Sequence, residues 1–289
     1  MATQTVQATN TAPKKKIKIA PIVCFIVTVI LAVLFIYPVY FAVISAFKSN
    51  GEILKAPLAF PTELYLQNFK DLFAKTDFFT AIWHTVFLTV VSEVLIILVV
   101  PLSAYAIERH NSKATKFVYA YFTAGMMIPF HLYMFPLFKE MKVFHIYGTL
   151  WGPIICYIAG SVAFGTLLYT SFLKGVPIDI EEAAKIDGAS DREILFKIKL
   201  PMVMPSITIC TFLTLTNSFK LFDQNVALTA GEPANASEML ALNIYNTFYG
   251  RSGAQWKGIG QAKAVVFFLI VVVISLIQLH FTRSKEVQQ

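Results

Sequence analysis

The sequence places few side chains at spacings that support catalysis. Ser171 and Lys174 have the SxxK spacing of serine acyl-transfer enzymes. Both lie at the end of a long apolar run, where a lysine is expected to anchor a membrane helix, so we expect no catalytic role for them. The sequence contains no nucleophile elbow, no HExxH zinc motif and no GxxxxGK[ST] phosphate loop. We therefore predict no catalytic residues, no metal site and no enzymatic activity.

Four polar side chains within apolar runs or at their ends are candidates for a translocation pathway. Glu93 is the only acid deep inside such a run, roughly 18–20 Å along a helix from its start. An acid at that depth usually faces a bundle interior or a water-filled cavity. It either lines a pathway or is a structural carboxyl that contacts a companion chain. His131, Asn217 and Lys220 are further candidates, with an interior histidine and interface anchors as the alternatives.

The composition places these residues in a lipid bilayer. Hydrophobic residues make up 56% of the 289 residues and charged residues 14%, where soluble domains approach a quarter charged. The net charge is +7, but the Lys and Arg residues are scattered at the ends of apolar runs. Membrane orientation explains such a distribution better than nucleic-acid binding, which gathers basic residues on one face.

Six apolar runs reach the length of about 20 residues that a membrane helix needs. Helices are expected because lipid offers backbone polar groups no other partners. We therefore predict an all-α membrane protein with a transmembrane domain at 19–281, a disordered cytoplasmic tail at 1–18 and a cytoplasmic C-terminal tail at 282–289. The predicted spans are 19–47, 80–107, 117–138, 148–173, 201–222 and 259–281.

The distribution of Lys and Arg orients these spans. With the N-terminus inside, the inner segments hold 14 of the 24 Lys and Arg residues and the outer segments hold 8. This excess favours cytoplasmic N- and C-termini. It also places a charged loop at 177–200 in the cytoplasm and a long polar loop at 223–258 outside.

The loop at 177–200 opens with residues typical of a short helix. Asp179 and Glu182 have the spacing of a capping box, in which each side chain bonds to the backbone of the other. Glu181 and Lys185 are spaced i, i+4, which predicts a modest ion pair on the helix surface.

A glycine and a second cap follow this helix. Gly188 suits a helix C-terminus, because glycine adopts the left-handed conformation cheaply. Ser190 and Glu193 again have capping-box spacing. Pro201 and Pro205 are expected to end the second helix before the fifth span begins.

The same loop resembles a known motif. It matches the pattern EAA-x3-G-x9-I-x-LP from Glu182 to Pro201, which is the EAA motif of permease subunits in binding-protein-dependent ABC importers. Four further stretches are similar to the MalG-like, carbohydrate-type permeases of this class, and the resemblance covers about residues 20–285. These are YPVYFAVISAFKSNGEI (37–53), NFKDLF (68–73), MMIP (126–129) and GEPANASEMLALNIYNTFYG (231–250).

The resemblance implies a type I ABC importer permease fold, with a cytoplasmic coupling-helix loop between the fourth and fifth helices. In such permeases the helix at the motif docks in a cleft of a cytoplasmic ATPase. Glu182 would then meet the ATPase, Ala183 and Ala184 would fit its groove, and Gly188 would set the bend. The implied ATPase-coupling residues are Glu181, Glu182, Ala183, Ala184, Asp187, Gly188, Ile198, Leu200 and Pro201.

The resemblance also implies a function and partners. The chain would be a permease subunit of an ATP-driven sugar importer, carrying an oligosaccharide across a bacterial cytoplasmic membrane. Its partners would be a second homologous permease, two copies of an ABC ATPase, and a lipid-anchored or periplasmic sugar-binding protein that the loop at 223–258 reaches. ATP and Mg would bind to the ATPase, and this chain would bind no cofactor and no nucleic acid.

One alternative comes from a different class of transporter. An ion- or proton-coupled secondary transporter would use Glu93 as its proton site. That class often has internal repeats with paired broken helices, and no clear repeat is apparent in this sequence.

Overall fold

The computed structural model describes residues 19–110, 112–253 and 255–284, and these residues form helices and turns without a strand. The predicted tail at 1–18 and most of that at 282–289 lie outside the described residues. The elements are α1 (Ile19–Ala46), α2 (Asn50–Lys55), α3 (Gln67–Ala74), α4 (Phe78–Arg109), α5 (Lys113–Met126), α6 (Phe130–Val143), α7 (Trp151–Leu173), α8 (Ile178–Ile186), α9 (Asp191–Glu193), the π-helical turn η1 (Ile194–Lys199), α10 (Leu200–Phe219), α11 (Asp223–Leu228), α12 (Leu240–Tyr249) and α13 (Gln255–Arg283).

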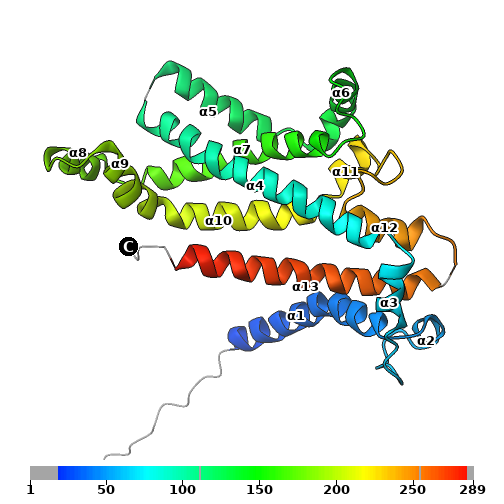
Figure 1. The fold of residues 1–289 in the computed structure, drawn as a ribbon. Coiled ribbons are helices and arrows are strands. Elements are labelled where there is room, and N and C mark those ends of the chain that lie inside the picture. Colours follow the sequence, from blue (N-terminus) through cyan, green and yellow to red (C-terminus); the bar gives the residue numbers. More distant parts are fainter. Residues whose placement is uncertain (1–18, 111, 254, 285–289) are drawn as a thin grey trace, which may run out of the picture.

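The long helices lie side by side along one direction (Figure 1). α4, α7 and α10 pack on one another and form the centre of the bundle, with α5 against α4 and α7. α13 packs on α10, and α1 packs on α13. The all-helical fold that the sequence predicts is therefore confirmed for the described residues.

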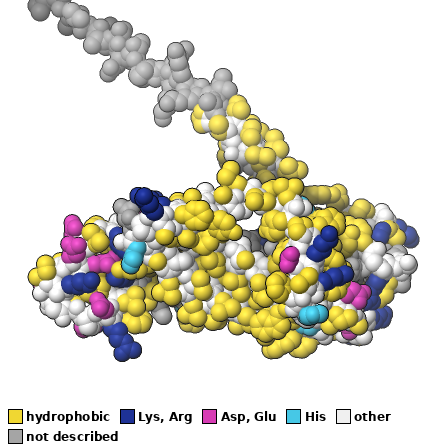
Figure 2. All heavy atoms as spheres, turned by 90° about the horizontal axis from the view of Figure 1, so that it is seen from above, with side chains coloured by type: hydrophobic (Ala, Val, Ile, Leu, Met, Phe, Trp, Pro, Cys, Tyr) yellow, Lys and Arg dark blue, Asp and Glu magenta, His cyan; other side chains and the backbone are white. Residues whose placement is uncertain are grey.

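The connecting segments gather at two opposite ends of this bundle. α8 and α9 lie at the same end as the start of α1 and the end of α13, and α2, α3, α11 and α12 lie at the other end (Figure 1). Charged side chains are concentrated toward the two ends in Figure 2, and hydrophobic side chains cover most of the surface between them. This is the arrangement expected of a multi-pass membrane protein, and it groups the loops as the predicted inner and outer sets.

Five helical segments among the described residues are long and apolar enough to cross a membrane. They are Val23–Ala46, Phe78–Arg109, Trp151–Leu173, Asp191–Phe219 and Trp256–Arg283. Each corresponds to one of the predicted spans, although the fourth segment begins ten residues earlier than predicted because the helix runs on from the preceding loop.

The predicted third span at 117–138 is wrong as a continuous helix. It is divided into α5 and α6, which have 14 residues each. A helix of that length extends about 21 Å, less than the hydrocarbon core of about 30 Å. The break occurs at Pro129, which has extended backbone (φ −61°, ψ 141°) as the N-cap of α6. Proline lacks the N–H that would continue α5 and disfavours helical backbone in the residue before it.

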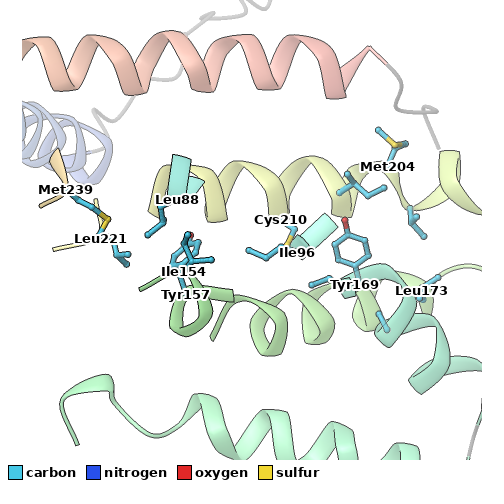
Figure 3. Packing of buried hydrophobic residues seen from close by; sticks show 14 residues of the cluster. Leu88, Ile96, Ile154, Tyr157, Tyr169, Leu173, Met204, Cys210, Leu221 and Met239 are labelled. Atoms are coloured by element: carbon cyan, nitrogen blue, oxygen red, sulfur yellow. The ribbon is translucent and has the colours of Figure 1, made fainter. Parts of the chain in front are cut away.

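The main core lies where α4, α7 and α10 meet. Figure 3 shows Leu88 and Ile96 from α4, Tyr157 and Tyr169 from α7, and Cys210 from α10 pointing into this contact. The close approach of these helices depends on Gly165 of α7. A Cβ at Gly165 would lie 3.0 Å from both methyl groups of Val100 and 3.1 Å from the Cys210 sulfur.

We predict that Gly165→Ala destabilises the bundle and that Gly160→Ala, in the same helix, does not. A Cβ at Gly160 meets no atom within 4 Å. Both substitutions bring the same gain in helix propensity, about 1 kcal/mol, so their difference isolates the packing contact. Overpacking should leave Gly165→Ala less stable than Gly160→Ala by about 1–3 kcal/mol. Thermal unfolding of the purified chain in detergent measures this, and equal midpoints for the two variants contradict it.

Candidate functional site

The predicted coupling helix is α8, which protrudes with α9 from one end of the bundle (Figure 1). The predicted capping box of Asp179 and Glu182 is wrong. The N-cap is Pro177, which has extended backbone and no side-chain acceptor, and Asp179 lies within the first turn. An acidic side chain in the first turn still interacts favourably with the helix dipole.

The end of α8 follows the prediction. Gly188 has φ +84°, in the left-handed region that favours glycine. Its N–H donates to the carbonyl of Lys185 at 3.1 Å, and the N–H of Ala189 donates to the carbonyl of Ala184 at 3.0 Å. These two hydrogen bonds form a Schellman motif, which satisfies the last carbonyls of the helix and fixes the direction of the chain beyond it.

The second predicted capping box is confirmed. The Ser190 hydroxyl accepts a hydrogen bond from the Glu193 N–H at 3.3 Å, and the Glu193 carboxylate accepts one from the Ser190 N–H at 3.1 Å. The helix that starts here continues through η1 into α10, so the predicted end at Pro201 or Pro205 is wrong. Pro201 is the second residue of α10 and lies just after the π-helical turn. Its missing N–H removes one backbone hydrogen bond where the hydrogen-bond spacing already changes from that of a π-helix to that of an α-helix.

Glu181 differs most from the prediction. The expected surface pair with Lys185 is not formed, because Glu181 is buried with 6% of its surface exposed. Its carboxylate accepts from Arg109 of α4 at 3.1 Å and lies 3.1 Å from the ammonium of Lys199. The Tyr105 hydroxyl donates to the same carboxylate at 3.3 Å. We call Glu181, Arg109, Lys199 and Tyr105 the inner ion cluster.

The cluster is closed by further contacts among its members. The Lys199 ammonium donates to the Tyr105 hydroxyl at 2.7 Å and lies 4.3 Å from the centre of its ring. Arg109 also donates to the carbonyl of Val176, just before α8, at 3.1 Å. A buried carboxylate is tolerated only when paired and hydrogen-bonded. Glu181 therefore fixes α8 to α4 and to the start of α10.

The predicted ATPase-coupling residues divide into exposed and packed groups. The exposed residues are Glu182, Ala183, Asp187 and Gly188. The packed group consists of the buried Glu181 and four half-buried residues, Ala184, Ile198, Leu200 and Pro201. The motif thus contains a surface part, on which a partner can rest, and a part that holds this surface in place.

The prediction missed the apolar side chains at this end. Ile186, the last residue of α8, is 86% exposed, and Phe196 and Leu195 of η1 are exposed as well. An apolar residue in a short helix is usually assigned to the core face, so the sequence pattern gives no signal for its exposure. Ile186 lies one helical turn after Glu182, and exposed apolar side chains at such a position are typical of a surface that a partner protein covers.

Glu93 lies within α4 and is buried, with 7% of its surface exposed. Its two carboxylate oxygens have no hydrogen-bond partner among the described residues. One turn toward the outer end of α4, the Thr89 hydroxyl is 2.9 Å from the Ser218 hydroxyl of α10. Glu93 therefore sits inside the α4–α10 contact, and its role in a pathway stays a prediction.

The other three pathway candidates are exposed. His131 is on the first turn of α6, and Asn217 and Lys220 lie at the end of α10. The Lys220 N–H donates to the Asn217 carbonyl, so these two belong to one turn. The structure brings Asn217 and Lys220 together and leaves His131 and Glu93 on separate helices.

The loop at 223–258 is more ordered than its polar composition indicates. It contains α11 and α12, and it encloses buried polar side chains. The Glu238 carboxylate accepts from Asn243 at 2.8 Å and from Asn246 at 2.7 Å. Lys263 of α13, which is fully buried, donates to Asn243 at 2.6 Å and to Thr247 at 2.7 Å. We call these five residues the outer polar network.

Comparison with known families decides the class of this chain. A family model described as "binding-protein-dependent transport system inner membrane component" matches residues 97–287. The chain belongs to this family. The matched region begins within α4 and includes the inner ion cluster, the coupling loop and the outer polar network.

Curated relatives agree with this assignment. AmyC of Thermoanaerobacterium thermosulfurigenes, a probable starch degradation products transport system permease, is 31% identical over 85% of this chain and 87% of its own length. NgcG of Streptomyces coelicolor, a diacetylchitobiose uptake system permease, is 31% identical over 76% of this chain and 74% of its own length. AmyD of T. thermosulfurigenes is 43% identical, but the match spans about half of each chain, 48% and 46%.

Solved structures share the fold. A bacterial ABC transporter involved in import of the acidic polysaccharide alginate contains a chain that aligns with a TM-score of 0.77. The alignment has 18% identity and covers 93% of this chain and 98% of that one. The MetNI methionine ABC transporter aligns with a TM-score of 0.58 over 73% of this chain and 96% of its own. The fold of this chain is that of type I ABC importer permeases. As a permease of this family, the chain is a transport subunit and not an enzyme. The comparisons give no support to a secondary transporter.

The setting of Glu93 generates a prediction about stability. An unpaired carboxylate buried in an apolar bundle is costly, and glutamine keeps its shape without the charge. We expect the thermal unfolding midpoint of Glu93→Gln in detergent to equal or exceed that of the unmodified chain. Thr89→Val, one turn away, is the comparison: it removes the hydrogen bond to Ser218 and should cost about 0.5–1.5 kcal/mol. A fall in the Glu93→Gln midpoint as large as that of Thr89→Val would show that the carboxylate is paired.

Proposed function

We propose that this chain forms half of the transmembrane pathway of an ATP-driven importer whose cargo is an oligosaccharide. The match to AmyC over most of both chains carries this proposal. AmyC is named for starch degradation products and NgcG for diacetylchitobiose, which are both short chains of linked sugars. The solved transporter with the same fold imports a polysaccharide.

The importer would contain several further proteins. AmyC and AmyD are two permeases named for one transport system, which supports pairing of this chain with a second homologous permease. A related alginate transporter has been solved in complex with a pentasaccharide-bound periplasmic protein, which supports a lipid-anchored or periplasmic sugar-binding protein that contacts the loop at 223–258. The sequence has no phosphate loop, so ATP and Mg would bind to two copies of a partner ATPase.

The coupling loop would receive the mechanical input of the ATPase. In this proposal the end of the bundle with α8, the start of α1 and the end of α13 faces the bacterial cytoplasm, in line with the excess of Lys and Arg in the segments assigned there. The ATPase contacts the exposed Glu182, Ala183 and Asp187, with Ile186 in an apolar groove. Closure of the ATPase pair on ATP then displaces α8, and the bundle moves between two arrangements that open to opposite sides.

The four polar candidates would line the sugar pathway. Asn217 and Lys220 are exposed at the outer end of α10, and His131 is exposed on α6. Such groups can exchange hydrogen bonds with sugar hydroxyls as the cargo passes. Glu93 would join them in the arrangement that separates α4 from α10, because its carboxylate then gains access to the cargo.

Reconstituted transport tests the proposed function. The chain is co-expressed with its companion permease, ATPase and binding protein, and the complex is placed in liposomes with ATP inside. We expect uptake of labelled maltooligosaccharides or other oligosaccharides that the binding protein retains. A non-hydrolysable ATP analogue serves as the control, and uptake that continues with the analogue, or that depends only on a proton gradient, contradicts the proposal.

We predict that Glu182→Lys and Gly188→Pro both abolish transport-linked ATP hydrolysis in these liposomes. Glu182→Lys reverses a charge on the proposed contact surface. Gly188→Pro imposes φ near −65° where the chain has +84°, and it removes an N–H donor of the Schellman motif.

Gly51→Ala is the matched control for the glycine variant. A Cβ at Gly51 meets no atom within 4 Å, and Gly51 is at the opposite end of the bundle, in α2. It should couple normally. Full coupling in both Glu182→Lys and Gly188→Pro would refute docking of the ATPase on this loop.

A further inference from the structure

One helix contacts both ends of the proposed mechanism. α4 has 32 residues and continues as one helix through Pro101, so it extends about 48 Å along the bundle. Its last turns supply Arg109 and Tyr105 to the inner ion cluster. Its first turns contact the loop at 223–258 through His84 and Thr85.

The inner contact controls the orientation of α8. Glu181 is the buried residue of α8, whereas most of the helix is exposed. α8 is joined to α7 by the short turn at Gly175 and to α9 by the turn at Gly188, and the hydrogen bonds of both turns run between neighbouring residues of the chain. Without Glu181, the described contacts leave little to stop α8 from pivoting when a partner pushes on it.

The outer contact fixes the loop to α4 through backbone groups. The Thr85 hydroxyl accepts a hydrogen bond from the N–H of Leu240 at 2.9 Å, at the start of α12. His84 Nδ1 lies 3.0 Å from the carbonyl oxygen of Glu238. The Glu238 side chain in turn accepts hydrogen bonds from Asn243 and Asn246 of the outer polar network. A shift of α4 therefore moves this part of the loop directly.

We propose that Glu181 is a positioning residue that locks α8 onto α4 and α10, and that α4 carries the displacement of α8 to the outer loop at Glu238–Leu240. This inference rests on the proposed function, since it describes how an ATPase and a binding protein on opposite sides would affect each other. A displacement at the inner end acts on this ion cluster, which resists separation because the buried Glu181 carboxylate would lose its cations. A continuous helix then moves as one body with its packed neighbours.

Glu181→Gln in the reconstituted complex tests the inner lock. We expect stimulation of ATP hydrolysis by sugar-loaded binding protein to fall about fivefold or more, while the ATPase still co-purifies through the exposed face of α8. Asp71→Asn is the matched control, because it removes the ion pair between the half-buried Asp71 and the exposed Lys75 at the opposite end of the bundle and should keep full stimulation. Stimulation equal to wild type in Glu181→Gln overturns the lock.

A measurement of the distance between α8 and α4 distinguishes a role of Glu181 in positioning α8 from a role in the stability of the whole chain. Spin labels at Lys185→Cys on α8 and Ala106→Cys on α4, both exposed sites outside the proposed ATPase contact, are introduced after Cys24 and Cys156 are replaced by serine. The buried Cys210 is kept. We expect one narrow distance distribution with Glu181 present and a broad one in Glu181→Gln. A narrow distribution in both contradicts the lock. If Glu181→Gln does not fold, Lys199→Gln removes one cation of the cluster and should broaden the distribution less.

One double variant and one single variant test transmission along α4. Arg109→Gln combined with Glu181→Gln should reduce stimulation no more than the stronger single change, because both act on one ion pair. Thr85→Val leaves the Leu240 N–H without its acceptor, and it should reduce stimulation while the α8 distance stays narrow. Additive losses in the first pair, or normal stimulation in Thr85→Val, contradict the inference. The proposed function itself fails separately, if the wild-type complex shows no ATP-dependent uptake.

Discussion

Polar groups that enter the apolar interior of this bundle must be satisfied by the chain itself, because lipid offers them no partners. The buried charges show how this requirement shapes the structure. Lys263 is fully buried and donates to Asn243 and Thr247, and the buried Lys48 donates to the carbonyls of Ala56 and Pro57. Glu181 is held by two cations and a tyrosine hydroxyl. Lys263 and Glu181 each connect a long helix to a segment outside the long helices, and Lys48 holds the turn after α1 against the segment after α2.

This constraint gives the loops their order. Lys263 holds α12 against α13 in a loop whose composition alone indicates a flexible polar segment. Asn68 likewise donates to the carbonyls of Ala46 and Lys48 at 2.9 and 2.8 Å, which attaches α3 to the end of α1. At the opposite end Glu181 does the same for α8. The connecting segments are thus parts of the bundle, and a force on them acts on the long helices.

Local signals predicted the parts of this fold that depend on neighbouring residues. The Gly188 bend and the box of Ser190 and Glu193 rely on contacts within four residues, and both are present. The predictions failed where a distant residue competes. Glu181 was assigned to Lys185, one turn away. Instead, Arg109 of α4 and Lys199 of η1 bind its carboxylate, which is buried. No pattern in one sequence shows that Arg109 lies beside Glu181.

Proline was the second source of error, for a related reason. Pro201 was expected to end a helix, and Pro129 lay inside the predicted span at 117–138. The outcome is the reverse, since α9, η1 and α10 continue through Pro201 while the chain breaks at Pro129. Pro201 removes one backbone hydrogen bond from this continuous helix, but it directly follows a π-helical turn, where the hydrogen-bond spacing already changes. The effect of a proline therefore depends on where the preceding helix ends, which packing decides.

Glu93 is the exception to the constraint that orders the rest of the molecule. Its carboxylate is buried and has no partner among the described residues, whereas the other buried acids, Glu181 and Glu238, have several. The nearby α5 has no buried residue, and the apolar side chains of α1 are exposed from Val23 to Val39. These surfaces require lipid or a second bundle to cover them. In the proposed importer, the second permease would cover the apolar face, and the second permease or the cargo would supply the partner that the Glu93 carboxylate lacks.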